Sequence, residues 1–181
     1  MTLDQLPAFV RGDVFRVVVE SPRGSSVKLK FDPGTGAMTL SRPLTLGLTY
    51  PFDWGFVPST RAADGDPLDA VILWDGASYP GIVIPCRAIG VLAVEQTNTT
   101  SHKRERNDRV AMLPVDAPRY ADVESVFDLT KRVRDELEEF FRHAVAFEGK
   151  AIQFLGWSGP EVALNEIRQH TRTASPPKRR R

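Results

Sequence analysis

Three aspartates crowd a single short turn of this sequence. Asp64, Asp66 and Asp69 fall within six residues, in the segment "ADGDPLDAV", and Pro67 stands between the second and the third. Like charges this close repel one another, so they stay ionised together only where a cation neutralises them. Carboxylate oxygens are the ligands that Mg²⁺ prefers, and Mn²⁺ accepts the same ligands. The spacing therefore predicts a divalent metal site, and a solvated acidic turn is the alternative.

Other motifs that use aspartates do not fit this spacing. An EF-hand loop starting at Asp64 needs glycine at its sixth position and glutamate at its twelfth, but the sequence has Asp69 and Asp75 there. The nucleophilic aspartate of a phosphotransferase ends a buried strand, whereas the segment "STRAA" precedes Asp64. The three histidines are widely spaced and do not cluster with the single cysteine, so zinc is not indicated.

The elements that must position the aspartates are mostly short strands. Apolar runs and alternating patterns predict strands over residues 14–20, 27–31, 37–42, 70–74, 86–94, 109–113 and 151–157. Within the second of these the alternation is strict, which places Lys28 and Lys30 on one face. The turn "DPGTG" should join that strand to the next as a hairpin. The polar segment 95–109 has no clear period and is predicted to be a long exposed loop.

Two helices are predicted near the end of the chain. Asp128 is expected to cap the first, over 129–144, whose apolar stripe consists of Leu129, Val133, Leu137, Phe140, Phe141 and Ala144. The second begins at "SGPE", where Ser158 and Glu161 have capping-box spacing and Pro160 lies in the first turn. Short strands followed by helices indicate an α+β fold, mainly β, in which a barrel or curled sheet is flanked by helices.

The composition indicates one globular domain. Hydrophobic residues make up 41% of the 181 residues, and no apolar run approaches the roughly 20 residues of a membrane span. The N-terminus lacks the pattern of a signal peptide, and Cys86 is the single cysteine, so a cytoplasmic setting is expected.

The last residues differ in character from the rest of the chain. The net charge is +1, but the four basic residues of "KRRR" account for it, and the remainder carries −3. We therefore predict a domain over 1–172 and a disordered basic tail over 173–181. An acidic body without clustered exposed aromatic residues makes nucleic acid an unlikely partner class.

The signature "DGDPLD" resembles the D-G-D-P-x-D motif of the soluble family I inorganic pyrophosphatases. The chain resembles a divergent member of that family. Further segments resemble the same family in the same order: "VVVE", "VKLKFD", "LSRPL", "TYPFDWGFVPST", "PCRAIGVL" and the closing "GW". The resemblance implies a five-stranded OB-like barrel with flanking helices, assembled as a homo-oligomer, often a hexamer in bacteria. It also implies Mg²⁺-dependent hydrolysis of pyrophosphate.

The resemblance assigns roles to individual residues. The implied metal ligands are Asp64, Asp66, Asp69, Glu20 and Asp108. Asp66 would also be the general base for a water that the metal ions acidify. The implied phosphate-binding cations are Lys28, Arg42 and Arg109, and Tyr50 is the retained catalytic tyrosine.

Several positions depart from the family pattern. Lys30 stands where the family has a glutamate, Trp54 where it has a tyrosine, and Gln96 where it has a metal-binding aspartate. A tyrosine-lysine pair on the long helix, which grips the leaving phosphate, becomes Ala144 and Val145, and neither can bind an anion.

A further metal-binding aspartate aligns with either Asn107 or Asp108.

Three functions stay open on the sequence alone. In the first, the chain is a working pyrophosphatase in which Arg104, Arg106 and Arg109 replace the lost clamp. In the second, it hydrolyses another phosphoanhydride. In the third, it is a non-catalytic module that binds phosphate or nucleic acid.

Overall fold

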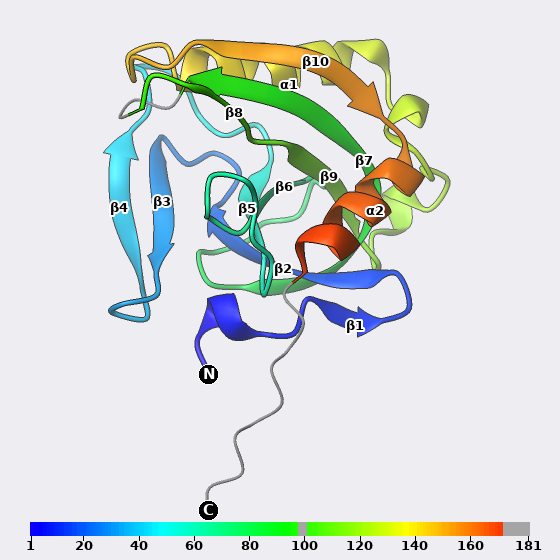
Figure 1. The fold of residues 1–181 in the computed structure, drawn as a ribbon. Coiled ribbons are helices and arrows are strands. Elements are labelled where there is room, and N and C mark those ends of the chain that lie inside the picture. The colour runs from blue at the N-terminus through cyan, green and yellow to red at the C-terminus, as the bar shows by residue number, and fades with distance from the viewer. Residues whose placement is uncertain (98–100, 172–181) are drawn as a thin grey trace, which may run out of the picture.

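The computed structural model describes residues 1–97 and 101–171 (Figure 1). Its strands are β1 (Phe9–Arg11), β2 (Val14–Ser21), β3 (Val27–Asp32), β4 (Ala37–Pro43), β5 (Asp53–Val57), β6 (Leu68–Ile72), β7 (Val83–Thr97), β8 (Arg104–Arg106), β9 (Arg109–Pro114) and β10 (Ile152–Ser158). The helices are α1 (Lys131–Ala144) and α2 (Pro160–His170), with 3-10 turns η1 (Leu3–Gln5), η2 (Pro118–Tyr120) and η3 (Val126–Asp128). The predicted tail over 173–181 lies outside the described residues.

Five strands close into a barrel. The ladder runs β2–β5–β6–β9–β7, and β7 pairs back onto β2, where Phe15 lies opposite Cys86. The β6–β9 pair is parallel and the other four are antiparallel. This closure confirms the OB-like, mainly β fold with two helices. The hairpin of β3 and β4 stands beside the barrel, and β10 continues the sheet from β7 (Figure 1).

Two apolar clusters hold the barrel and its helices together. The barrel interior is filled by buried side chains that include Phe15, Leu68, Ile72 and Met112, and Ile167 of α2 belongs to the same cluster. On the other side of the sheet, the predicted stripe of α1 packs on the barrel strands: Leu137, Phe140, Phe141 and Ala144 are buried, and Leu129 and Val133 are partly buried against them. No helix within the two described stretches is long and apolar enough to cross a membrane.

Both helices begin later than the capping patterns indicated. Helix α1 has Thr130 as its N-cap, while the Asp128 carboxylate accepts a 2.8 Å hydrogen bond from the backbone N–H of Ser125 and closes η3. Helix α2 has Gly159 as its N-cap without a side-chain cap. Ser158 cannot cap it, because it ends β10 and pairs with Val91. Pro160 does lie in the first turn, as predicted.

The predicted loop over 95–109 is mostly strand in the described residues. Strand β7 continues to Thr97, and β8 pairs with it so that Glu95 lies opposite Arg106. Polar side chains hid this ladder from the sequence pattern, because its edge position leaves those side chains at the surface.

Strand β5 was not predicted, although all five of its residues are buried. Its glycine explains both the omission and the packing. A Cβ at Gly55 would collide with the backbone carbonyl oxygen of Val18, so β5 and β2 approach more closely than a larger residue allows. This contact matters for the site, because β5 also carries Trp54.

Candidate active site

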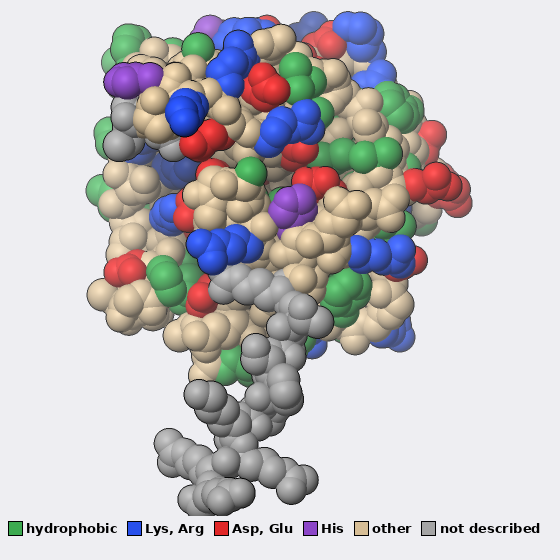
Figure 2. Space-filling view, viewed as in Figure 1, with side chains coloured by type: hydrophobic (Ala, Val, Ile, Leu, Met, Phe, Trp, Pro, Cys, Tyr) green, Lys and Arg blue, Asp and Glu red, His purple; other side chains and the backbone are tan. Residues whose placement is uncertain are grey.

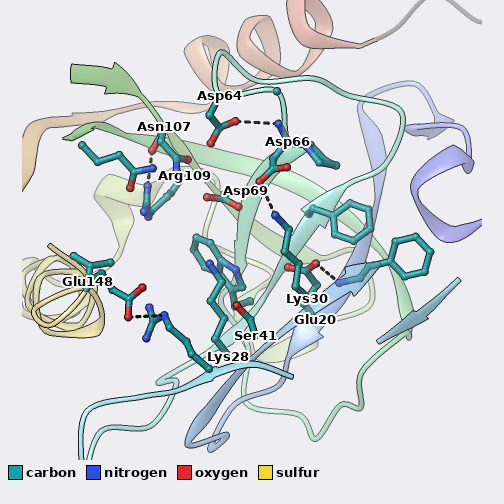
Figure 3. Close-up of a pocket in the computed structure, with 18 of the residues that line it drawn as sticks. Glu20, Lys28, Lys30, Ser41, Asp64, Asp66, Asp69, Asn107, Arg109 and Glu148 are labelled. Atoms are coloured by element: carbon teal, nitrogen blue, oxygen red, sulfur yellow. Dashed lines mark hydrogen bonds and ion pairs between the residues drawn. The ribbon is translucent and has the colours of Figure 1, made fainter. Parts of the chain in front are cut away.

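A cavity of about 650 Å³ lies between the barrel and the β3–β4 hairpin, where residues from seven strands and from the segment after α1 meet. Figure 3 shows its side chains projecting toward one another from these elements. The charged residues that line it are Asp4, Glu20, Lys28, Lys30, Arg42, Asp64, Asp66, Asp69, Arg109, Glu148 and Lys150. Six carboxylates and five cations therefore share one cavity, which is the composition of a site for a phosphate ester or anhydride and its metal ions.

The three sequence-predicted aspartates all line this cavity. Asp64 and Asp66 lie in the turn before β6, where the Asp64 Oδ1 accepts a 3.1 Å hydrogen bond from the backbone N–H of Asp66. Asp69 lies within β6, opposite Arg109 of β9. Burial raises the pKa of Asp64 and of Asp69, which means that their negative charge is held at a cost. A cation at this turn would offset that cost.

Both lysines of β3 reach the cavity, as the alternation predicted. Burial lowers the pKa of Lys28, against the attraction of Asp69 and Glu20. Lys30 donates from Nζ to Asp66 Oδ2 at 2.7 Å (Figure 3). Burial opposes the charge on Lys30, but the hydrogen bond and the attraction of Asp66 outweigh it and raise its pKa.

Glu20 lies near the end of β2 and is buried at the cavity wall. Its Oε1 accepts a 2.7 Å hydrogen bond from the backbone N–H of Phe31, which ties the carboxyl group to β3. Burial raises the pKa of Glu20 to about 7, so near neutral pH this carboxyl group exchanges a proton readily.

Arg42 of β4 lines the cavity, and its side chain is fixed by two contacts with residues at and after the end of α1. Its Nη2 donates to the carbonyl oxygen of Ala144 at 2.7 Å, and its Nε lies 3.2 Å from Glu148 Oε1. Val145 and Lys150 line the cavity near this contact. The arginine is thus held by the C-terminal end of α1 and by the turn that follows it.

Sequence reasoning missed Ser41, Glu148 and Lys150 as cavity residues. The short segment "EGK" follows the predicted long helix by only a few residues, and that helix end was already identified as the leaving-phosphate side. Its two charged residues were the available signal.

The cavity floor is formed by a buried arginine. Arg109 is 5% exposed, and its guanidinium lies 5.5 Å from the centre of the Trp54 ring and 4.9 Å from that of Phe141. Burial lowers the pKa of Arg109, against the attraction of Asp69. The positive charge of Arg109 is therefore stabilised by the faces of these two aromatic rings and by Asp69.

The two candidates for a further metal ligand point in different directions. Asn107 lines the cavity together with Gln96. The Asp108 carboxylate accepts a 2.8 Å hydrogen bond from the backbone N–H of Val94 and lies 2.6 Å from Arg106 Nη2. A metal-ligand role for Asp108 stays a prediction, and of the two residues Asn107 is the one that lines the cavity.

Tyr50 lies behind the cavity wall. It is buried, and its ring packs 5.0 Å from Phe140 and 6.4 Å from Trp54, centre to centre. Burial raises the pKa of Tyr50 to about 12, so its hydroxyl stays protonated. A catalytic role for Tyr50 stays a prediction, and its ring packs beside that of Trp54, which lines the cavity.

Two loop arginines that were considered as clamp replacements are engaged elsewhere. Arg104 pairs with Glu95 at 3.2 Å and donates to Gln153 at 2.6 Å, and Arg106 pairs with Asp108. Of the three candidates, Arg109 is the one that lines the cavity.

The oxygen donors of the aspartate turn fit a hard divalent ion by their chemistry. Asp69 adds negative charge that its surroundings destabilise, which a cation would relieve. Within the described residues, however, no three His, Cys, Asp or Glu side chains are gathered closely enough to hold an ion in this conformation. Lys30 already holds one of the three aspartates, Asp66.

Comparison with known proteins agrees with this geometry. The family model described as inorganic pyrophosphatase matches residues 17–175. The inorganic pyrophosphatase of Synechocystis sp. is 36% identical over 164 residues, covering 91% of this chain and 94% of that protein, and the one of Nostoc sp. is 38% identical over 157 residues, covering 87% and 89%. The crystal structure of the inorganic pyrophosphatase from Thermus thermophilus superposes with a TM-score of 0.87 at 32% identity, over 94% of this chain and 97% of that one. Because the family model spans most of the chain and these relatives share more than 30% of its residues over nearly their whole length, this chain belongs to the inorganic pyrophosphatase family.

Proposed function

We propose that this protein hydrolyses inorganic pyrophosphate to two phosphates with the help of Mg²⁺, or of Mn²⁺ in its place. The observation that carries the proposal is the cavity itself. Asp64 and Asp66 of the turn before β6 and Asp69 of β6 itself share a space of about 650 Å³ with the cationic side chains of the β3–β4 hairpin and with the buried Arg109. Such an arrangement has cations for the phosphate oxygens and carboxylates for metal ions within one site.

The aspartate turn would hold the metal ions, with Asp64, Asp66 and Asp69 as ligands and Glu20 at the edge of the cluster. When bound, the ions lower the pKa of a water molecule so that it attacks phosphorus near neutral pH. Asp66 has one carboxylate oxygen on Lys30 and a second one free of that contact, which can accept the proton of the attacking water.

The cations would neutralise the phosphate oxygens as charge moves to the leaving group. Lys28 and Arg109 lie close enough to Asp69 for its charge to affect their pKa values, so both belong to the side of the attacked phosphate. Arg42 and Lys150 lie on the side of Val145, where the leaving phosphate would be bound. Lys150 thus offers a positive charge that Val145 does not.

We also propose that the chain acts as a homo-oligomer, with a hexamer as the specific expectation. Large apolar side chains near the end of α1 support this proposal, because Leu46 is fully exposed and Phe147 is 83% exposed in the single chain. The two lie on segments that touch, since the Thr45 hydroxyl donates to the carbonyl oxygen of His143 at 3.2 Å.

A cytoplasmic setting stays a prediction.

The test is a phosphate-release assay with purified protein, pyrophosphate and Mg²⁺, repeated with Mn²⁺ and with EDTA. Parallel reactions with a nucleoside triphosphate and with tripolyphosphate address hydrolysis of another phosphoanhydride. We expect pyrophosphate to be the preferred substrate and EDTA to stop the reaction. Release from a longer phosphoanhydride alone, or from none, would reject the proposal.

Binding to nucleic acid has less support than hydrolysis. Figure 2 shows blue and red side chains interspersed over the face that it displays, and a nucleic-acid-binding surface instead gathers basic side chains into one stripe or patch.

A further inference from the structure

An ion pair lies inside the cavity, at the aspartate turn itself. The Lys30 ammonium is 2.7 Å from Asp66 Oδ2, and the two side chains are 47% and 56% exposed. The partners come from β3 and from the turn before β6, 36 residues apart in the chain. Ion pairs of this exposure contribute little to stability, so the interest of this one lies in its place, at the residue that would activate water.

The ammonium group lies among more than one carboxylate. Besides Asp66, Glu20 and Asp69 attract it, and the backbone amide that follows Lys30 in the chain binds Glu20. Figure 3 shows Lys30 reaching from β3 toward the aspartate turn, with Glu20 beside its stem. Among the described residues no three acidic side chains are gathered closely enough here to hold a divalent ion, so the ammonium group is the cation that neutralises Asp66 in this conformation.

The end of β7 and the link between β8 and β9 contribute amides to the cavity wall in place of further negative charge. Gln96 and Asn107 both line the cavity. Each can offer a carbonyl oxygen but no charge, so neither compensates a divalent ion as a carboxylate does. Glu148 is paired with Arg42 at 3.2 Å. The cavity therefore contains several cationic side chains of its own. Beyond Asp64, Asp66, Asp69 and Glu20, it offers few carboxylates that could bind a metal ion.

We propose that Lys30 is a tethered cation that takes the place of one divalent ion at the Asp66 edge of the cluster. One of its three N–H donors holds Asp66, and the others are available to a phosphate oxygen of the substrate. A lysine carries one charge and needs no free metal, so the site works with fewer divalent ions than a cluster in which a carboxylate or amide stands at position 30. This inference rests on the proposed function, because it concerns how the same cavity neutralises its substrate.

The first experiment counts metal ions without substrate, so it does not depend on hydrolysis. Mn²⁺ binding is measured by titration calorimetry and by the loss of the free Mn²⁺ signal in electron paramagnetic resonance, for the full chain and for Lys30→Glu, Lys30→Gln and Lys131→Glu. Lys131 lies on α1 and pairs with Asp135 four residues on, so its variant makes the same charge change at the surface, outside the cavity residues.

We expect Lys30→Glu to bind one more Mn²⁺ per chain than the unmodified protein, and Lys30→Gln to bind Mn²⁺ about tenfold more tightly. Lys131→Glu should match the unmodified protein in both respects. Equal counts and affinities in all four proteins would overturn the inference. If Lys30→Glu melts at a much lower temperature, Lys30→Gln carries the comparison, since it introduces no new charge.

The second experiment separates a cation that assists the reaction from one that merely blocks Asp66. Initial rates of pyrophosphate hydrolysis are measured over a range of Mg²⁺ for the unmodified protein and Lys30→Gln. A tethered cation that assists predicts that Lys30→Gln is about tenfold slower at low Mg²⁺, with a steeper dependence on Mg²⁺ and partial recovery when Mg²⁺ is high. A variant that is faster at low Mg²⁺ would show that Lys30 only competes with metal, which contradicts the proposal.

The two failures can be told apart. If the unmodified protein releases no phosphate from pyrophosphate, the proposed function fails, and the Mn²⁺ counts still decide whether Lys30 occupies a metal position. If phosphate is released but the counts are equal, the proposed function stands and the inference about Lys30 fails.

Discussion

The guanidinium of Arg109 lies over the ring of Trp54, with 5.5 Å between the guanidinium carbon and the ring centre. The two residues come from β9 and β5, and both line the cavity floor. Each keeps a buried N–H group, Nε1 of Trp54 and Nε of Arg109, that has no hydrogen-bond partner within the described part of the chain. Buried donors are normally satisfied, so this pair is suited to a ligand oxygen at the cavity floor.

Trp54→Phe tests this relationship, because phenylalanine keeps an aromatic face for Arg109 but removes the indole donor. A hydrogen bond of this kind contributes about 1 kcal/mol, so KM for pyrophosphate should rise about fivefold. The melting temperature should fall as well, because the smaller ring leaves a cavity in the apolar cluster to which Trp54 belongs. Intrinsic fluorescence of the unmodified protein should change when phosphate is added, and that change should vanish in Trp54→Phe. Trp74→Phe is the matched control, since the Trp74 indole already donates to Asp53 at 2.7 Å, and it should keep the response.

Asp66→Asn should abolish hydrolysis without unfolding the protein. Asparagine keeps the shape of the side chain but cannot accept the proton of the attacking water, and loss of a general base costs roughly 10²- to 10⁴-fold in rate. The rate of phosphate release and a melting curve are the measurements. Asp135→Asn on the surface of α1 serves as the control and should stay fully active. A fully active Asp66→Asn protein would remove the role assigned to this residue.

Divalent metal should stabilise the folded chain. Binding of an ion to the native state alone adds about 2.7 kcal/mol at a concentration one hundred times its Kd, because mass action favours the state that binds. Melting curves recorded in EDTA and in millimolar Mn²⁺ should therefore differ by several degrees. Asp69→Asn should shrink that difference. Superimposable curves for the unmodified protein would favour the solvated acidic turn.

Stability without metal should depend on pH through Glu20. Its pKa is about 7 in the folded chain, against the ordinary value of 4.5 for a glutamate exposed in the unfolded chain, so the folded state binds more protons between these values. Stability therefore falls as pH rises through this window, by about 3 kcal/mol in total, and the loss is complete above pH 7. Chemical denaturation in EDTA at pH 5 and pH 8 measures the difference. Glu20→Gln should flatten the dependence, and an unchanged slope in that variant would assign it to other groups.

The end of α1 offers a gain-of-activity test. Val145 lines the cavity, so Val145→Lys should add a cation on the leaving-phosphate side and raise kcat/KM severalfold. Ala144 is only 8% exposed and belongs to the apolar cluster under α1, so Ala144→Tyr should instead lower stability by about 1–3 kcal/mol through overpacking. Steady-state rates and denaturation curves distinguish the two effects. A Val145→Lys protein with no gain would indicate that Lys150 already supplies the charge.

The sequence by itself determined the features that depend on local spacing. The short motif of Asp64, Asp66 and Asp69 is local, and all three residues line the cavity. The alternation of β3 has a period of two residues and the apolar stripe of α1 one of three to four, and both patterns predicted which side chains share a face. The collinear motifs also indicated the family and its barrel. Capping patterns were less informative, because pairing of β10 up to Ser158 moved the start of α2.

Only the tertiary structure decided which charged groups meet. Arg42 reaches the carbonyl oxygen of Ala144 across 102 residues of sequence, and Lys30 reaches Asp66 across 36. Closure of β7 onto β2 and the position of the hairpin bring these atoms together, and no periodicity encodes that distance. The partner of a long charged side chain is set by distance and burial in the folded chain, since Coulomb attraction and desolvation act through space. For this reason the family could be predicted from residue spacing, whereas the cation at Asp66 could be found only in the fold.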